Sequence, residues 1–404
     1  MRLCSFCVLI LLASGASAQS ARAPWPTPAA PTSWPEVTPE LIDEAIATGV
    51  KRLVEMQEGD PKAEWPYEGV YRVGGEIPIG YRVGGTAIVV QALLLAPGYE
   101  DDDARRQAVE RAVAFICDAR DHPAMSVDDY AGGYDVRAWG YIEGAACLSR
   151  LISLKRVPHT RRQAVDETLA WYVEGIHKME IPVVGGWNYA RGPRDQQSAP
   201  SPFMTARALQ ALFEAASVGL KVDDAVVQRA LAVLEKARTS AGSVVYSGSA
   251  ATRDRPADAT PGATGRMTST EATLALAGRA TARECRGAVD AFLTHWPWLE
   301  QRRSQPGTHA GPYAVAPYYF MFAHYHAAQA VEQLPPAERA EYRRRVRQVI
   351  FRTRQEDGTW NDRVFPRSAA YGTAMALLAL MADRTTFSTW SPRNTPDGPE
   401  TPSP

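Results

Sequence analysis

The chain has 404 residues, of which 45% are hydrophobic and 22% charged, so it can bury one large core or two ordinary ones. Its formal net charge of -1 excludes the strongly basic surface that nucleic-acid binding requires. The sequence also lacks the polybasic patch of a membrane-surface protein. We therefore expect no nucleic-acid partner.

Residues 1–18 have the pattern of a secretory signal peptide. Arg2 provides the positive start, residues 8–13 form an apolar run, and Ala16 and Ala18 form a small-residue cleavage site. The apolar run is too short to cross a bilayer, and we expect no integral membrane segment after cleavage. An N-terminal membrane anchor is the alternative. The pattern predicts export, to the periplasm or the extracellular space.

Two Pro-rich segments flank the central part of the chain. We interpret residues 19–38 as an extended arm or linker and 384–404 as a disordered tail, because proline removes backbone donors and breaks helices. Three cysteines remain after cleavage, each in an apolar or helical context. We expect buried thiols, and one disulfide stays open as an alternative. These residues are Cys117, Cys147 and Cys285.

Between residues 39 and 383 the chain alternates two kinds of helical segment. The first kind is amphipathic: Val109, Ala112, Val113 and Ile116 line one face, with charged residues opposite. It recurs at 39–57, 103–120, 160–179, 223–238, 282–299 and 338–354. The second kind is rich in Ala, Gly and Leu, with almost no charge, and recurs at 85–96, 138–154, 202–217, 267–278, 313–331 and 369–382. A helix without a polar face must be enclosed on nearly all sides.

This alternation predicts an all-α fold of six helical hairpins, each an outer helix followed by an inner one. An open solenoid would need polar caps at both ends, but the first and last hairpins are as apolar inside as the middle ones. We therefore predict a closed (α/α)6 toroid over residues 39–383. Its parallel inner helices open their N-termini onto one face, where the long loops gather. These loops are 58–84, 121–137, 180–201 and 239–266.

The turn of the last hairpin carries the best-defined motif. It reads Gln355-Glu-Asp-Gly358-Thr-Trp360 and resembles the Q-W repeat of squalene-hopene cyclases. Weaker echoes are Gly185-Gly186-Trp187, Gly132-Gly133-Tyr134 and the stretch from Gln57 to Trp65. The chain thus resembles the α/α-toroid superfamily of terpenoid cyclases and protein prenyltransferases. The resemblance implies that Gln355, Gly358 and Trp360 brace neighbouring helical pairs.

The catalytic motifs of that superfamily do not appear in this sequence. Class II cyclases protonate their substrate with D-x-D-D, whereas the nearest stretch here, Ser126-Val127-Asp128-Asp129, lacks the first aspartate. Prenyltransferases bind zinc through an Asp-x-Cys pair and a distant His, whereas Cys285 follows Arg283-Glu284. We predict no metal site and no cofactor. The resemblance therefore implies the fold and leaves the chemistry to be found elsewhere.

Aromatic and arginine side chains cluster in or just after the loops of the predicted open face. Such side chains can stack on sugar rings or line an apolar cavity, or they can fill the mouth of the toroid as core. The candidate ligand-binding residues are Tyr67, Tyr71, Arg72, Tyr81, Arg82, Tyr134, Asp135, Trp139, Trp187, Tyr189, Arg191, Tyr313 and Tyr318.

The candidate catalytic residues are Asp128, Asp129, Glu143 and His309. The two aspartates are adjacent carboxylates in a loop, and His309 directly precedes an inner helix, where it could act as a base. Glu143 lies on an otherwise apolar helix, where a carboxylate must pair, protonate or face a cavity. It could serve as a general acid, and an ion pair with Arg137 or Arg207 is the structural alternative.

Three functions remain open on these observations. The loop face could bind a small molecule or partner without catalysis, hold a carbohydrate-active lyase or hydrolase, or act on an isoprenoid as a cyclase or prenyltransferase. A deep apolar shaft would favour the cyclase. A shallow cleft where Arg, Tyr and His309 converge would favour glycans. A mouth filled by its own aromatic residues would argue against both enzymes.

Overall fold

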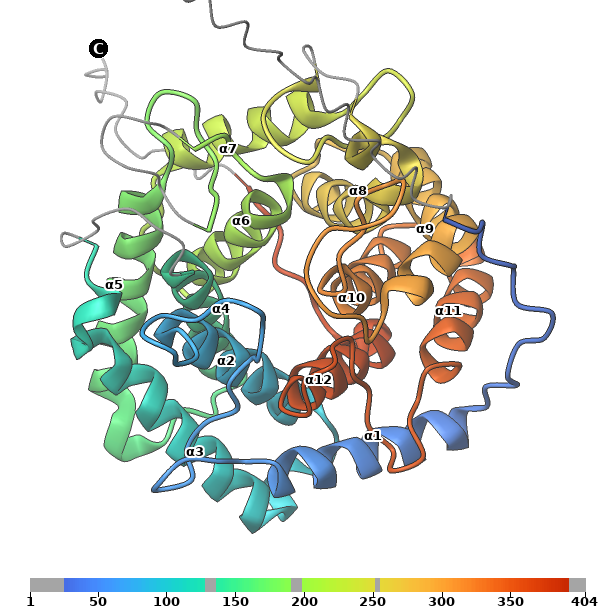
Figure 1. Ribbon diagram of the computed structural model, residues 1–404. Helices are drawn as coiled ribbons and strands as arrows, with labels where there is room; N and C mark the ends of the chain where they lie inside the picture. The colour runs from blue at the N-terminus through green and yellow to red at the C-terminus, as the bar shows by residue number, and fades with distance from the viewer. Residues whose placement is uncertain (1–24, 128–135, 190–197, 251–254, 392–404) are drawn as a thin grey trace, which may run out of the picture.

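The computed structural model describes residues 25–127, 136–189, 198–250 and 255–391. These ranges contain twelve α-helices in two concentric rings (Figure 1), with isolated β-bridges and no strand. The inner ring comprises α2 (Ile79–Leu95), α4 (Arg137–Ser153), α6 (Pro202–Ser217), α8 (Thr260–Leu276), α10 (Tyr319–Val331) and α12 (Ser368–Leu380). The outer ring comprises α1 (Pro39–Glu55), α3 (Asp103–Asp118), α5 (Arg162–Met179), α7 (Asp224–Ala237), α9 (Ala282–Arg302) and α11 (Pro336–Phe351). The predicted (α/α)6 toroid is confirmed.

The inner ring closes on itself. Each inner helix packs against the next in chain order, and α12 returns to pack against both α2 and α1. Every residue of α10 is buried, and in α2 only Arg82 and the C-terminal Leu95 are not. Helices of this composition are stable here because their neighbours cover them on all sides. Among the described residues, no helix is both long and apolar enough to cross a membrane.

Two inner helices begin well before the predicted residue, and one begins well after it. Helix α2 starts at Ile79 instead of residue 85, although glycine disfavours helices. A Cβ on Gly80 would lie 2.3 Å from the carbonyl oxygen of Val136, so packing on α4 requires this glycine. Helix α8 starts at Thr260 instead of residue 267. Helix α10 starts at Tyr319 instead of residue 313, after a left-handed Ala314 with φ of 48°.

Three tryptophans repeat one arrangement between an outer helix and the following inner helix. Each indole N–H donates to a carbonyl oxygen of the outer helix: Trp65 to Leu53 at 2.7 Å, Trp187 to Ile176 at 2.7 Å and Trp360 to Ile350 at 2.9 Å. Their backbone N–H groups donate to threonine hydroxyls of the inner helix, at Thr86, Thr205 and Thr373. Each tryptophan therefore fastens the two helices of its own hairpin.

The turn around Gly358 joins the last hairpin to the first. Arg354 pairs with Glu44 of α1 at 2.6 Å, and Asp357 pairs with Arg52 of the same helix at 3.2 Å. Gly358 has φ of 85°, and a Cβ there would lie 2.5 Å from the Thr48 side chain. The turn thus helps to close the ring.

The two glutamines of the motif act differently. The Gln355 side chain stays within its own turn and accepts a hydrogen bond from the Thr359 hydroxyl at 2.8 Å. The Gln57 side chain reaches the neighbouring hairpin, where it donates to the Ala108 carbonyl at 2.8 Å and accepts from Arg111 at 2.6 Å. A link between successive hairpins is therefore made at Gln57.

Both ends of the described chain lie on the helices. Residues 25–38 run along α9 and α11, where the Trp34 ring lies 6.0 Å from that of Trp296. Residues 385–391 cross the end opposite the long loops, and Trp390 stacks on Phe213 with ring centroids 5.5 Å apart. The predicted signal peptide, at residues 1–18, and residues 392–404 lie outside the described ranges. The three cysteines are buried and unpaired thiols.

Candidate functional site

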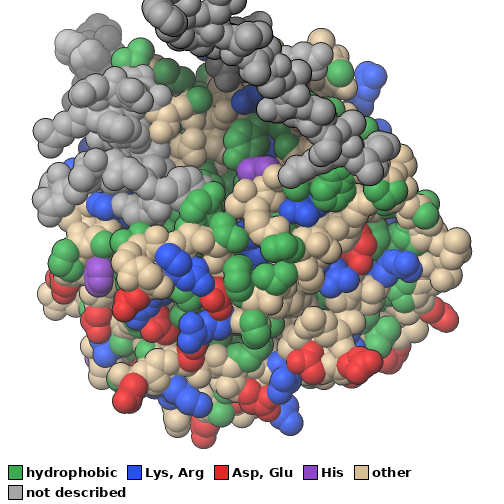
Figure 2. All heavy atoms as spheres, in the orientation of Figure 1, with side chains coloured by type: hydrophobic (Ala, Val, Ile, Leu, Met, Phe, Trp, Pro, Cys, Tyr) green, Lys and Arg blue, Asp and Glu red, His purple; other side chains and the backbone are tan. Residues whose placement is uncertain are grey.

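The N-terminal ends of the inner helices carry an aromatic cluster on the axis of the toroid. Figures 1 and 2 view this loop face, and Figure 2 shows a hollow with hydrophobic side chains and a histidine at its edge. The cavity on the axis is small. The volume that the centre of a water molecule can occupy in it is only about 20 Å³. It is lined by Tyr67, Tyr71, Tyr81, Trp139, Tyr189, Phe203, Tyr318, Arg363 and Tyr371.

Tyr67 lies at the centre of this cluster. Its ring centroid is 5.3 Å from that of Tyr81, 5.7 Å from that of Trp139 and 4.6 Å from that of Tyr371. The rings come from the first loop and from α2, α4 and α12, so they meet only because the ring of helices is closed. Together they fill the axis beneath the mouth. The cavity that they leave between them is too small to be a deep shaft.

Glu143 lies below this aromatic layer, in a second cavity of about 20 Å³. Arg207 of α6 donates to both carboxylate oxygens, with the shortest N–O distance at 3.0 Å. Burial raises the pKa of Glu143, and the charge and hydrogen bonds of Arg207 oppose that shift. Glu214 and Arg150 extend the network towards the opposite end, at an N–O distance of 3.2 Å. This geometry supports the structural alternative for Glu143, an ion pair with Arg207.

His309 lies at the edge of the mouth between two tyrosines. Its Nδ1 is 2.9 Å from the Ala314 carbonyl oxygen, so Nδ1 carries the proton and Nε2 is left as an acceptor. The hydroxyls of Tyr246 and Tyr318 lie 3.1 Å and 3.3 Å from Nε2. Burial lowers the pKa of His309 and raises that of Tyr246 to about 12. A neutral imidazole therefore faces two protonated phenols, an arrangement that can accept or relay a proton.

Arg363 connects this histidine to the aromatic cluster. Its Nε donates to the Tyr67 hydroxyl at 2.9 Å, and its Nη1 donates to the Gly307 carbonyl at 3.1 Å. The guanidinium also lies 5.8 Å from the ring centroid of Tyr318. Arg363 follows the repeat turn by three residues and is not among the residues predicted from the sequence. The same is true of Tyr246 and Tyr371.

Several predicted ligand-binding residues lie away from the mouth. Trp187 is fully buried in the brace between α5 and α6. Arg72 pairs with Glu68 at 2.7 Å. The Tyr313 ring lies edge-on to Trp298, with centroids 4.9 Å apart. Of the predicted set, Tyr67, Tyr71, Tyr81, Trp139, Tyr189 and Tyr318 do meet at the axis. Asp128, Asp129, Tyr134, Asp135 and Arg191 lie outside the described residues.

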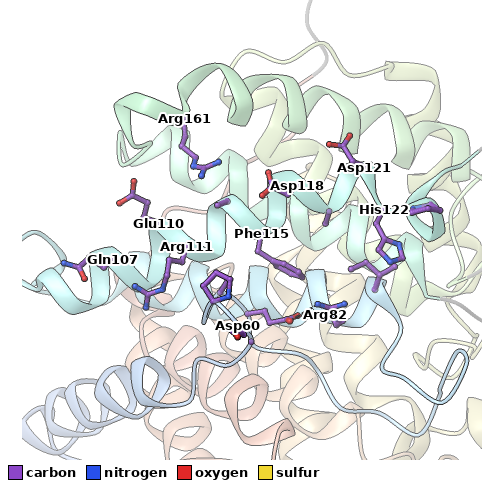
Figure 3. Close-up of a pocket in the computed structure, with 18 residues that line it drawn as sticks. Asp60, Arg82, Gln107, Glu110, Arg111, Phe115, Asp118, Asp121, His122 and Arg161 are labelled. Carbon is purple, nitrogen blue, oxygen red and sulfur yellow. Dashed lines mark hydrogen bonds and ion pairs between the residues drawn. The ribbon is translucent and has the colours of Figure 1, made fainter.

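Arg82 points away from the axis into a groove on the outside of the ring (Figure 3). It pairs with Glu64 at 2.7 Å, and its guanidinium lies 5.4 Å from the ring centroid of Phe115 in α3. The groove has a volume of about 1070 Å³ that the centres of water molecules can occupy. Acidic and basic side chains both line it. Its wide opening and mixed charge define no single ligand. Among the described residues, no group of three or more His, Cys, Asp and Glu side chains could hold a metal ion.

No protein-family model matches this sequence, and no curated protein matches it. Solved structures match in fold. The GH76A α-1,6-mannanase from Salegentibacter sp. HEL1_6 aligns with a TM-score of 0.54 and 11% identity, covering 85% of this chain and 99% of that one. An inactive variant of it, with two consecutive aspartates changed to asparagine and α-1,6-mannotriose bound, aligns at 0.52 and 11%, covering 84% and 99%. The unsaturated glucuronyl hydrolase from Bacillus sp. GL1 aligns at 0.51 and 14%, covering 86% and 97%.

These likenesses establish the class of the protein by its fold. At such low identity they show an α/α toroid and nothing finer. The expectation of an α/α-toroid fold is therefore confirmed, and the similar structures named above are a mannanase and a glucuronyl hydrolase.

Proposed function

We propose that this protein is an exported carbohydrate-active enzyme that binds a glycan across the loop face and cleaves a glycosidic bond there. The observation that carries the proposal is the convergence of His309, Tyr318 and Arg363 beside the aromatic cavity. A shallow site in which Arg, Tyr and His side chains converge favours a glycan ligand over an isoprenoid. Export is supported by the signal-peptide pattern of residues 1–18.

The chemistry of the mouth suits a sugar ligand. Aromatic rings offer apolar faces for sugar rings, while phenol, imidazole and guanidinium groups offer donors and acceptors for hydroxyls. His309 presents Nε2 as an acceptor beside the hydroxyls of Tyr246 and Tyr318, so it could take a proton from a substrate or from water that replaces one of these contacts. Tyr246 and Tyr318 stay protonated in this environment and could return a proton to the leaving oxygen.

The filled axis weighs against the cyclase alternative. An isoprenoid chain needs a long apolar cavity, whereas each axial cavity holds about one water molecule. The filled mouth was also expected to argue against a glycan enzyme. Filled space on the axis excludes only a substrate that must enter the axis. A glycan that lies across the rim does not need to enter it.

Asp128 and Asp129 are proposed as the carboxylate pair for hydrolysis. Glycosidases generally use two carboxyl groups, one to protonate the leaving oxygen and one to act as base or nucleophile. The inactive mannanase variant lacks two consecutive aspartates, and this chain has two consecutive aspartates between η3 (Pro123–Met125) and α4. A lyase would instead use His309 as base, and the two chemistries leave different products.

The test is a glycan-cleavage assay on the mature chain with neutral and acidic oligosaccharides. Hydrolysis releases reducing ends alone, whereas elimination also creates an ultraviolet-absorbing double bond. His309→Gln and the double variant Asp128→Asn, Asp129→Asn are compared with His159→Gln, which alters an exposed histidine on η4 (His159–Arg161). We expect the variant that lacks the acting base or carboxylate pair to lower kcat by about 100-fold or more, with Tm unchanged.

The outcomes separate the candidate functions. Loss of elimination in His309→Gln alone assigns a lyase, and loss of hydrolysis in the aspartate variant assigns a hydrolase. If no substrate is cleaved, the enzyme proposal fails. If glycans then still raise Tm, the protein is a glycan-binding toroid, the non-catalytic alternative.

A further inference from the structure

Two buried arginines flank His309 without an acidic partner. Arg266 of α8 is 1% exposed and Arg363 is 3% exposed. Arg266 donates to the carbonyl oxygens of Gly262 and Val244 at 3.0 Å and 3.3 Å. Arg363 donates to the Tyr67 hydroxyl and the Gly307 carbonyl. All these acceptors are neutral, and neither arginine forms a salt bridge within the described ranges.

The acidic groups nearest to these arginines do not cancel their charge. Asp258 is already paired with Arg255 at 2.9 Å. Asp362 is fully buried and has no hydrogen-bond partner for either carboxylate oxygen within the described ranges. Burial raises the pKa of Asp362 to about 7 although the charge of Arg363 opposes the shift, so at neutral pH Asp362 offsets the charge of Arg363 only in part. The mouth therefore keeps an excess of positive charge.

Both guanidinium groups lie close to the tyrosines that contact His309. Arg266 lies 5.4 Å from the ring centroid of Tyr246, and Arg363 lies 5.8 Å from that of Tyr318, the two tyrosines that contact His309. A buried cation without a counter-charge is costly, and an anion that approaches it recovers part of that cost. Aromatic walls of low dielectric strengthen the attraction. A neutral glycan offers no such gain.

We propose that the loop face takes an acidic glycan and that the carboxylate of a uronic acid residue sits beside Arg363. This inference rests on the proposed function. Arg363 is the arginine that lines the aromatic cavity, and guanidinium groups match planar carboxylates in geometry. A sulfated neutral glycan would bring the same charge without that planar group, so it serves as a comparison in the test.

The test measures binding of the full mature chain by calorimetry to three probes. These are oligogalacturonate, its fully methyl-esterified form, and a sulfated galactan of equal length. We expect oligogalacturonate to bind about 10-fold or more tightly than the ester, as for a hydrogen bond to a charged group. Added salt should weaken binding of the acid and leave that of the ester nearly unchanged.

Arg363→Gln should lower the affinity for the acid by about 10-fold or more beyond any loss of affinity for the ester, so that the preference for the acid disappears. Arg344→Gln, which removes the same charge from the exposed face of α11, is the control. Equal affinity of the wild type for acid and ester overturns the inference, as does tighter binding of the sulfated galactan. Because this comparison uses the wild type, it remains decisive if Arg363→Gln does not fold. Cleavage of neutral glycans alone would reject the acidic substrate and leave the proposed function standing, whereas no binding or cleavage of any glycan would reject both.

Discussion

The indole Nε1 of Trp360 donates a hydrogen bond to the carbonyl oxygen of Ile350 over 2.9 Å, at the end of the last outer helix. The backbone N–H of the same residue donates to Thr373 in the next inner helix at 3.1 Å. One buried residue thus links the end of an outer helix to the inner helix of the same hairpin.

Replacing Trp360 should lower stability before it affects any activity. Trp360→Phe keeps an aromatic ring and removes one hydrogen bond from the Ile350 carbonyl oxygen, which still accepts from Thr353, so it should cost about 0.5–1.5 kcal/mol. Trp360→Ala adds a cavity and should cost about 3–5 kcal/mol. Chemical denaturation measures both, with Trp298→Phe on the half-buried face of α9 as control. A Trp360→Ala protein with unchanged Tm would contradict the structural role.

Gly372 in α12 permits the close approach of the preceding loop. A Cβ at this position would lie 2.4 Å from the Trp360 carbonyl oxygen, which is backbone and cannot move aside. Gly372→Ala should therefore cost about 1–3 kcal/mol or more. Gly287, in the outer helix α9, has open space around its Cβ position. Gly287→Ala should stabilise by roughly 0.5–1 kcal/mol. Effects of the same sign in thermal unfolding would argue against this packing.

The Glu143–Arg207 pair should matter for stability and not for catalysis. Glu143→Gln leaves Arg207 buried with less compensation and should cost about 3–5 kcal/mol. The double variant Glu143→Leu, Arg207→Met replaces the pair by apolar side chains, and should recover much of that loss. Denaturant midpoints check both expectations. A turnover defect in a folded double variant would instead return Glu143 to the catalytic candidates.

Asp362 should make the protein less stable as pH rises. Its folded-state pKa of about 7 lies above the ordinary value of 3.8, so between these values the folded chain binds more protons than the unfolded chain. The free energy of unfolding therefore falls with rising pH in this window. Asp362→Asn should remove the fall, and stabilise by roughly 2–4 kcal/mol near pH 8 with little change near pH 4. Asp166→Asn, on the exposed face of α5, is the matched control.

The helical hairpins could be predicted because their signal is local. Amphipathic and apolar segments alternate along the chain, and each pattern depends only on residues within a few turns. Predicted helix boundaries differ from the structure where packing overrides propensity. Helix α2 starts six residues before the predicted position, because contact of Gly80 with the start of α4 stabilises a glycine-rich first turn. The long-loop face also followed from this local pattern, and six of the ten predicted ligand-binding residues that the structure describes, including Tyr67 and Trp139, meet at the axis.

The arrangement of the candidate site could not be predicted in the same way. Tyr81 and Arg82 are adjacent in sequence, yet one faces the axis and the other the outer groove, because successive residues of a helix point about 100° apart. Arg363 contacts Tyr67, 296 residues away, and nothing in either local sequence marks that pair. Asp362 has a perturbed pKa only because the closed ring buries it.

The sequence by itself determined that this protein is a ring of six helical hairpins, since the periodicity of apolar residues decides which faces must be covered. Only the tertiary structure decided what lies on the axis. Ring closure sets the radius of the inner ring, and that radius leaves room for the rings of Tyr67, Tyr81, Trp139 and Tyr371 with almost no space between them. The same closure brings His309, Tyr318 and Arg363 together at the rim, where the proposed chemistry has its place.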